Sequence, residues 1–218
     1  MNPDRKCVKF GCDYAELVWL DRDESLQTNN GFLIAKVAGN YCPNCAASYG
    51  NSQMPQKKRF SLLSENDQHQ LQYWADKYQC INGVFVEVGS GFGASTFLLA
   101  SGSNARRPTI HCYDYFESDK LVNFQLFVSN FQHRIIVHEG DFNETMRLLP
   151  PVAFAFIDHN HTFADTKSAY QKIWPFVKLG GAMAFHDFGH PDYPGGTRFL
   201  KSLKAGQNYS GIYLIEKS

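Results

Sequence analysis

One short segment, residues 84–96, limits the possible folds more than any other part of the chain. It starts with a β-branched, apolar run that reaches an acid at Glu87, and it continues with three alternating glycines, Gly89, Gly91 and Gly93. An apolar stretch that predicts a helix follows directly. In a strand–turn–helix unit, bare glycine backbone and a helix N-terminus can approach a nucleotide-like ligand closely. The segment therefore predicts an α/β unit with a ligand site at its turn.

Strands and helices alternate along the rest of the chain. Apolar runs predict strands at 84–88, 109–113, 134–138, 152–157 and 182–186, and helices between them at 93–101, 119–130, 143–148 and 162–177. Ser64 and Asp67, which are spaced like a capping box, predict one more helix before the first strand. The tail predicts a final strand pair. This alternation is typical of the α/β class, and we expect a doubly wound, mostly parallel, seven-stranded Rossmann-like sheet.

The first fifty residues differ from the rest because they hold four of the six cysteines, Cys7, Cys12, Cys42 and Cys45. The Cys-Pro-x-Cys turn aims two thiolates at one point, and a second close pair would complete a tetrahedral zinc site. A segment of this size builds little core, so a structural metal would stabilise it. Free thiols and a redox pair are the alternatives. We predict a small zinc-binding module at 1–52, a polar linker at 51–60, and a second domain at 60–218.

Charge and hydropathy count against several classes of protein. The 21 acidic residues balance the 21 lysines and arginines, so a broad basic surface for nucleic acid is not expected. No apolar run reaches the roughly 18 residues that a membrane span needs. The N-terminus also lacks the apolar core of a secretory signal. We therefore expect a cytoplasmic protein, in which cysteines are more often thiols or metal ligands than disulfides.

Acidic residues stand at or just after the ends of five predicted strands: Glu87, Asp114, Asp141, Asp158 and Asp187. In an open parallel sheet the ligand lies beyond the carboxyl ends of the strands. Five acids in register are more than core packing requires, so they predict a polar site along this edge. A dinucleotide is one candidate ligand, with Asp114 holding its ribose.

The same turn, Glu87-x-Gly89-x-Gly91-x-Gly93, resembles the first motif of the class I S-adenosylmethionine-dependent methyltransferases. The resemblance implies that Glu87 and the glycine backbone hold the amino acid end of the cofactor, and that Asp114 accepts its ribose hydroxyls. The run at 139–142 is similar to the motif of the third strand, which implies that Asp141 meets the adenine. A dehydrogenase gives Asp141 no comparable role, so the methyl donor is favoured. The implied cofactor-binding residues are Glu87, Gly89, Ser90, Gly91, Gly93, Asp114, Asp141, Phe142 and Asp158.

A second resemblance follows the later strands. Asp158-x-x-His161, then a Gly-Gly pair and His186-Asp187, is similar to the metal-dependent sugar O-methyltransferases of the macrocin and mycinamicin type. The resemblance implies that Asp158 and Asp187 bind a divalent cation, magnesium or manganese. His186 stands where related chains often have an acid, and a histidine ligand would favour manganese.

The same resemblance makes His161 the general base, so His161 and Asp158 are the expected catalytic residues. A neutral imidazole, with an ordinary pKa of about 6.5, is suited to take a proton near pH 7. His161 and Asp187 could instead be helix caps. Residues 189–196 carry His190 and Tyr193 among glycines and prolines, and they predict a loop beside the acceptor.

Together these features predict an O-methyltransferase that acts on a hydroxyl of a sugar, a glycan or a similarly polar small molecule. Its expected cofactors are S-adenosylmethionine, magnesium or manganese, and a structural zinc. Relatives often associate, so a homo-oligomer is among the expected states. One alternative is a binding protein whose cysteine module recognises RNA, protein or glycan. Another is a dinucleotide-dependent oxidoreductase.

Overall fold

The computed structural model describes residues 63–101, 108–117 and 120–218, together with the backbone of four short strands that precede them. These strands form two antiparallel pairs, β1 (Val18–Leu20) with β4 (Gly39–Tyr41) and β2 (Ser25–Thr28) with β3 (Gly31–Ile34). The predicted zinc ligands, Cys7, Cys12, Cys42 and Cys45, and the linker at 51–60 lie outside the described residues. The zinc-binding module therefore stays a prediction.

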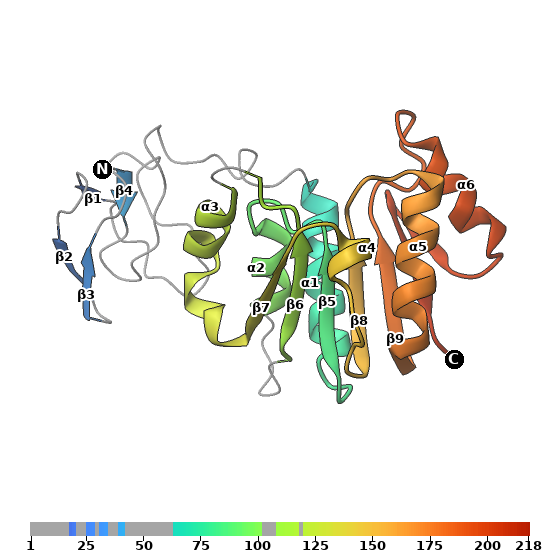
Figure 1. Ribbon diagram of the computed structural model, residues 1–218, viewed down its shortest axis with the longest axis horizontal. Coiled ribbons are helices and arrows are strands. Elements are labelled where there is room, and N and C mark those ends of the chain that lie inside the picture. Colours follow the sequence, from blue (N-terminus) through green and yellow to red (C-terminus); the bar gives the residue numbers. More distant parts are fainter. Residues whose placement is uncertain are drawn as a thin grey trace.

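The main body is built on one seven-stranded sheet with the order β10-β11-β9-β8-β5-β6-β7 (Figure 1). Five of its strands run parallel: β5 (Val84–Val88), β6 (Ile110–Asp114), β7 (Ile135–Glu139), β8 (Val152–Ile157) and β9 (Val177–Phe185). Two antiparallel strands, β11 (Ile212–Glu216) and β10 (Gln207–Tyr209), complete the β9 edge. This arrangement confirms the predicted α/β class and the final strand pair.

The order of the strands creates a switch point between β5 and β8. From β5 the chain moves outward through β6 to β7, and it then returns to the other side of β5 to form β8. In open α/β sheets a ligand binds beyond the carboxyl ends of the strands at such a point. The glycine turn directly follows β5, so it lies at the place where this topology predicts a site.

Helices cover both faces of the sheet, which explains why β8 is apolar throughout and β5 is apolar except for Glu87. The first core cluster joins one sheet face to α1 (Glu65–Tyr78), α2 (Ala94–Ala100) and α3 (Lys120–Phe127), and in it Tyr78 stacks on Phe154 at a ring distance of 5.2 Å. The second cluster joins the other face to α4 (Phe142–Thr145), α5 (Phe163–Ile173) and α6 (Pro194–Ser202). Among the described helices, none has the length and apolar composition needed to cross a membrane.

Three predicted elements differ from the observed ones near glycines and prolines. The strand predicted at 182–186 already begins at Val177, because Gly181 packs against the Ala153 carbonyl of β8 where the register shifts. The helix predicted at 143–148 ends at Thr145, ahead of the Pro150–Pro151 pair. The helix predicted at 162–177 ends at Ile173, and a 3-10 turn that contains Pro175 follows it. Proline cannot continue an α-helix.

The expected capping box at the start of α1 is present. The Asp67 backbone N–H donates to Ser64 Oγ over 3.2 Å, and the Ser64 backbone N–H donates to Asp67 Oδ2 over 3.0 Å. These bonds satisfy donors that a helix N-terminus leaves without partners. The helix then buries Leu71, Trp74 and Tyr78 against the sheet.

Replacing Ser64 with alanine removes the accepting side chain of this cap. We expect Ser64→Ala to lower the free energy of unfolding by about 1 kcal/mol, measured by urea denaturation. Ser64→Asn keeps an accepting oxygen and serves as the control, with a loss of only a few tenths of that value. Equal stability of Ser64→Ala and the wild type would contradict a stabilising role for the cap.

Candidate active site

The turn after β5 brings the chain against the end of β8. Gly89, Gly91 and Gly93 all have positive φ angles, of 90°, 50° and 92°. A Cβ at Gly89 would overlap the backbone carbonyl of Asp158, whereas a Cβ at Gly91 would meet nothing within 4 Å. Gly89 is therefore needed for packing, and Gly91 borders open space at the turn.

Asp114, at the end of β6, lies directly beside this turn. Its Oδ2 accepts a hydrogen bond from the Gly91 backbone N–H over 2.8 Å, and its Oδ1 accepts one from the Phe116 N–H over 3.0 Å. A carboxylate has about four acceptor positions, so further hydrogen bonds remain available to it. The structure thus brings together Asp114 and the glycines, as the sequence predicts.

Glu87 lies beneath the turn and not on its surface. Its side chain is completely buried, and its Oε2 accepts hydrogen bonds from Thr96 Oγ1 and, over 3.5 Å, from Cys112 Sγ. Burial raises the pKa of Glu87, and hydrogen bonds from Ser95 and Thr96 oppose that shift. This geometry favours a role in holding α2 against β5, whereas the sequence suggested direct contact with a cofactor.

The ends of β6 and β7 meet through Tyr115 and Asp141. The Tyr115 hydroxyl donates to Asp141 Oδ2 over 2.6 Å, and the Asn143 N–H donates to Asp141 Oδ1 over 2.6 Å. The Tyr115 bond is the main cause of the lowered pKa of Asp141. Phe142 follows and packs edge-on against Tyr113. Sequence reasoning missed Tyr115, whose signal was an aromatic residue directly after a strand-end acid.

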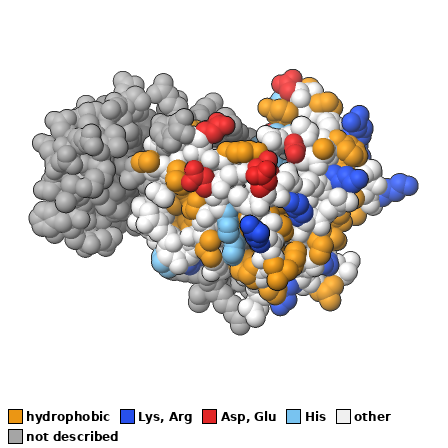
Figure 2. Space-filling view, in the orientation of Figure 1, with side chains coloured by type: hydrophobic (Ala, Val, Ile, Leu, Met, Phe, Trp, Pro, Cys, Tyr) orange, Lys and Arg blue, Asp and Glu red, His pale blue; other side chains and the backbone are white. Residues whose placement is uncertain are grey.

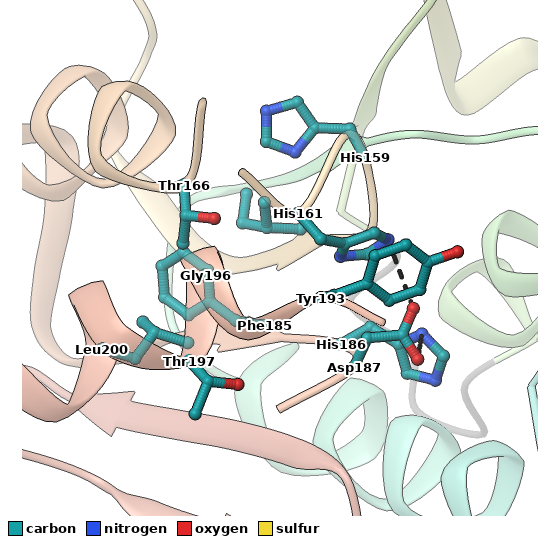
Figure 3. Close-up of a pocket in the computed structure, with 11 residues that line it drawn as sticks. His159, His161, Thr166, Phe185, His186, Asp187, Tyr193, Gly196, Thr197 and Leu200 are labelled. Atoms are coloured by element: carbon teal, nitrogen blue, oxygen red, sulfur yellow. Dashed lines mark ion pairs between the residues drawn. The ribbon is translucent and has the colours of Figure 1, made fainter. Parts of the chain in front are cut away.

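Asp158, His161 and Asp187 form a compact group beyond β8 and β9. Figure 3 draws His161 and Asp187 of this group. His161 Nε2 lies 3.2 Å from Asp187 Oδ2 and 3.7 Å from Asp158 Oδ1. One donor atom from each of the three residues lies within 4.8 Å of the others. The two carboxylates supply oxygen ligands of the kind that a divalent cation such as magnesium or manganese prefers, and the imidazole lies beside them. In Figure 2, the visible acidic side chains lie on the upper half of the described part of the molecule.

His186 lies directly beside this group. Its Nδ1 is 3.1 Å from Asp158 Oδ1 and 3.5 Å from Asp187 Oδ1, and its Nε2 is 3.5 Å from Asp67 Oδ2. Burial lowers the pKa of His186, but the hydrogen bonds to Asp158 and Asp187 outweigh it and raise the pKa to about 10. The three-residue group that could hold an ion contains His161, and a metal-binding role of His186 stays a prediction.

Asp67 is the second residue that sequence reasoning missed. It belongs to the capping box of α1 and also faces His186, with a side chain that is only 8% exposed. The sequence offered one signal for this role, an aspartate at a position where a capping box usually has glutamate. The shorter aspartate side chain keeps its carboxylate close to the helix end. Asp67 therefore links α1 to the acidic group.

His161 is not a helix cap. The cap of α5 is Thr162, whose Oγ1 accepts from the Asp165 N–H over 3.1 Å. Burial lowers the pKa of His161, against the opposing effect of Asp158 and Asp187, so its imidazole is neutral at pH 7. Asp187 also does not cap α6, whose cap position is Tyr193. Its φ of 56° is instead a rare conformation for a non-glycine residue, of the kind that clusters at functional sites.

Residues 86–188, a little under half of the chain, match the family described as methyltransferase domain. The chain carries a methyltransferase domain. The matched segment begins within β5 and ends just after Asp187, so it contains the glycine turn and the acidic group. This match counts against the dinucleotide-dependent oxidoreductase that the glycine turn alone left open. No curated protein matches the sequence significantly.

Solved structures share the fold of this methyltransferase domain at low identity. CalS11, described as a TDP-rhamnose 3'-O-methyltransferase of calicheamicin biosynthesis, is 17% identical with a TM-score of 0.58, covering 72% of this chain and 81% of that one. An O-methyltransferase from Bacillus cereus in complex with SAH is 15% identical with a TM-score of 0.60. This match covers 73% of this chain and 86% of the Bacillus cereus chain. MycE in complex with Mg, SAH and mycinamycin VI is 18% identical with a TM-score of 0.55. This match covers 74% of this chain and 51% of the MycE chain.

The glycines of the turn differ in what a side chain would meet. We expect Gly89→Ala to destabilise the methyltransferase domain by about 4 kcal/mol or more, because its Cβ would overlap the Asp158 carbonyl. Gly91→Ala is the matched control and should cost roughly 1–2 kcal/mol, the penalty of a left-handed backbone alone. Urea denaturation measures both variants. Similar losses in the two would contradict the tight packing at Gly89.

The buried Glu87 carboxyl should make stability depend on pH. Its folded pKa lies above its unfolded value, so the wild type loses stability as the pH rises above about 4.5. Glu87→Gln mimics the protonated form, so its stability relative to the wild type should increase from pH 4.5 upward. Thermal unfolding of both proteins at pH values from about 4.5 upward measures this difference in stability. Glu139→Gln, at an exposed glutamate, is the control. A constant difference between Glu87→Gln and the wild type would show that Glu87 is ionised in the folded protein.

Proposed function

We propose that this chain is an S-adenosylmethionine-dependent O-methyltransferase that acts on a hydroxyl of a sugar or a similarly polar small molecule. The observation that carries the proposal is a neutral imidazole, His161, placed between two carboxylates at the same sheet edge as the glycine turn. The methyltransferase domain match supports methyl transfer. The O-methyltransferases of the same fold, among them one named for TDP-rhamnose, support a hydroxyl acceptor.

The described residues fit an S-adenosyl cofactor at the switch point. Gly91 borders open space at the turn, and the Asp114 carboxylate lies beside it with acceptor positions left for ribose hydroxyls. Tyr115, Asp141 and Phe142 stand at the neighbouring strand ends, where an adenine would lie in this arrangement. When bound, S-adenosylmethionine supplies an electrophilic methyl group on a positively charged sulfur. The residues of the chain have to bind it and align the acceptor oxygen with that methyl group.

His161 would act as the general base. Its lowered pKa leaves Nε2 with a free lone pair at pH 7, so it can take the proton of the acceptor hydroxyl as the oxygen attacks. The imidazolium that forms would be stabilised by Asp187, whose Oδ2 lies 3.2 Å away, and by Asp158. The O–H bond of the acceptor and the S–CH₃ bond of the donor would break, and one O–CH₃ bond would form. S-adenosylhomocysteine would leave, and the proton would stay on His161 Nε2 until solvent removes it.

Asp158 and Asp187 would hold a divalent cation, magnesium or manganese. A bound cation lowers the pKa of a hydroxyl beside it, which a sugar alcohol needs because its own pKa is very high. His186 neutralises part of the negative charge of the two acids and keeps them oriented, and Asp67 holds its other ring nitrogen. The oxygen-rich donor set is the observation that supports the cation.

The remaining proposals rest on the sequence alone. They are the structural zinc on Cys7, Cys12, Cys42 and Cys45, the division into 1–52 and 60–218, a cytoplasmic location and a homo-oligomeric state. Zinc content of the purified full chain, compared with a Cys42→Ser, Cys45→Ser double variant, would measure the first of these. Equal zinc content in both proteins would remove the zinc site from the proposal.

Replacement of His161 tests the proposed base. We expect His161→Ala to lower kcat/KM by about two to four orders of magnitude, because the acceptor proton loses its receiver. The assay is transfer of a radiolabelled methyl group from S-adenosylmethionine to a panel of TDP-sugars and methyl glycosides. His69→Ala, an exposed histidine of α1, is the matched control and should keep full activity. A loss below tenfold in His161→Ala would exclude a role as base.

Removal of divalent ions tests the cation separately. We expect excess EDTA to abolish turnover and added magnesium or manganese to restore it, while the affinity for S-adenosylhomocysteine measured by calorimetry stays the same. Asp187→Asn should raise the metal concentration needed for half-maximal activity. Unchanged turnover in EDTA would remove the cation from the mechanism and leave the methyltransferase assignment intact.

A further inference from the structure

Tyr193 lies over the proposed base. It is the residue just before α6, its side chain is 41% exposed, and its ring centroid lies 4.6 Å from that of His161 at an angle of 35°. On the other side it faces the His190 ring at 5.0 Å. Figure 3 shows the Tyr193 ring beside His161 and Asp187 at the edge of the pocket. The ring therefore forms part of the wall of the site beside the proposed base.

The Tyr193 ring and the His161 imidazole are held together by one packed turn. The Gly196 N–H donates to the His161 carbonyl over 2.8 Å, so the start of α6 is bonded to the segment that carries His161. A Cβ at Gly195 would come within 2.6 Å of the Phe163 nitrogen, and a Cβ at Gly196 within 2.9 Å of Thr166 Oγ1. This close approach fixes the distance between the two rings.

We infer that Tyr193 contacts the acceptor and that its ring stacks on the carbon face of a sugar. The inference rests on the proposed function, because it uses His161 as the proton acceptor. A hydroxyl that reaches His161 Nε2 brings the ring atoms to which it is attached into contact with the adjacent Tyr193 ring. The exposed aromatic surface is then the first apolar surface that the acceptor meets.

The chemistry around Tyr193 favours a sugar over a planar aromatic acceptor. A pyranose has one face of C–H groups, which packs on an aromatic ring, and a rim of hydroxyls, which needs polar partners. Tyr193 supplies a single exposed ring, and the polar groups His161, His190 and Asp187 lie near it. A planar aromatic acceptor is better held between two apolar walls. Within the described part of the pocket, Tyr193 is the only residue with an exposed aromatic ring.

Binding of methyl α-L-rhamnoside to the full chain, saturated with S-adenosylhomocysteine and manganese, tests the inference. We expect saturation-transfer NMR to show contact mainly at C–H groups of one face of the sugar. Tyr193→Phe keeps the ring and should bind with unchanged affinity, whereas Tyr193→Ala should bind about tenfold more weakly. Tyr73→Ala removes an exposed tyrosine of α1 and is the control. The S-adenosylhomocysteine affinity and unfolding midpoint of each variant should match the wild type.

Several results would overturn the inference. One is that Tyr193→Ala binds the sugar with the same affinity as the wild type. Another is that the wild type binds catechol more tightly than the rhamnoside. The third is that the wild type binds none of the methyl rhamnoside, glucoside and mannoside. Failure of the proposed function has a different signature, since the wild type would then neither bind S-adenosylhomocysteine nor transfer a methyl group. A protein that transfers methyl groups but ignores the Tyr193→Ala change would refute only the role of Tyr193.

Discussion

The parallel hydrogen-bond ladder extends one residue beyond the strands, and the site depends on this extension. The Asp158 N–H donates to the Val88 carbonyl over 2.7 Å, and the His186 N–H donates to the Ile157 carbonyl over 2.9 Å. The same pattern ties Gly89 to Tyr113 and Gly140 to Asp114. Backbone bonds therefore fix the residues that follow the strands before any side chain interacts. This gives a rigid edge, on which functional groups are positioned more precisely than on free loops.

The charge balance on this edge depends on one buried, positively charged side chain, His186. Three carboxylates, from Asp67, Asp158 and Asp187, converge on the His186 imidazole, which is only 9% exposed. Acids at such short distances repel one another strongly in a poorly solvated environment, and a shared positive charge relieves that repulsion. The pKa of Asp187 is accordingly lowered, chiefly by its hydrogen bond with His186. The pKa of His161 is lowered first by burial and, to a smaller extent, by the charge of His186.

Local patterns predicted the elements and the strand-end acids well, because strand periodicity, glycine turns and capping boxes depend on nearby residues. The strands at 84–88 and 152–157 match the structure residue for residue. The orientation of Glu87 could not be read in this way, since it depends on how α2 packs behind β5. Asp67 and His186 are separated by 119 residues along the chain, so only the tertiary structure brings them together.

The glycine pair at the start of α6 has a consequence for redesign. Because Gly195 and Gly196 allow the helix to touch the backbone that carries His161, the loop that leads into α6 cannot be exchanged as an independent module. A transplanted loop that brings larger residues to these two positions would push the helix outward and carry the proposed base with it. Engineering of substrate scope would therefore have to vary residues 190–193 and retain both glycines.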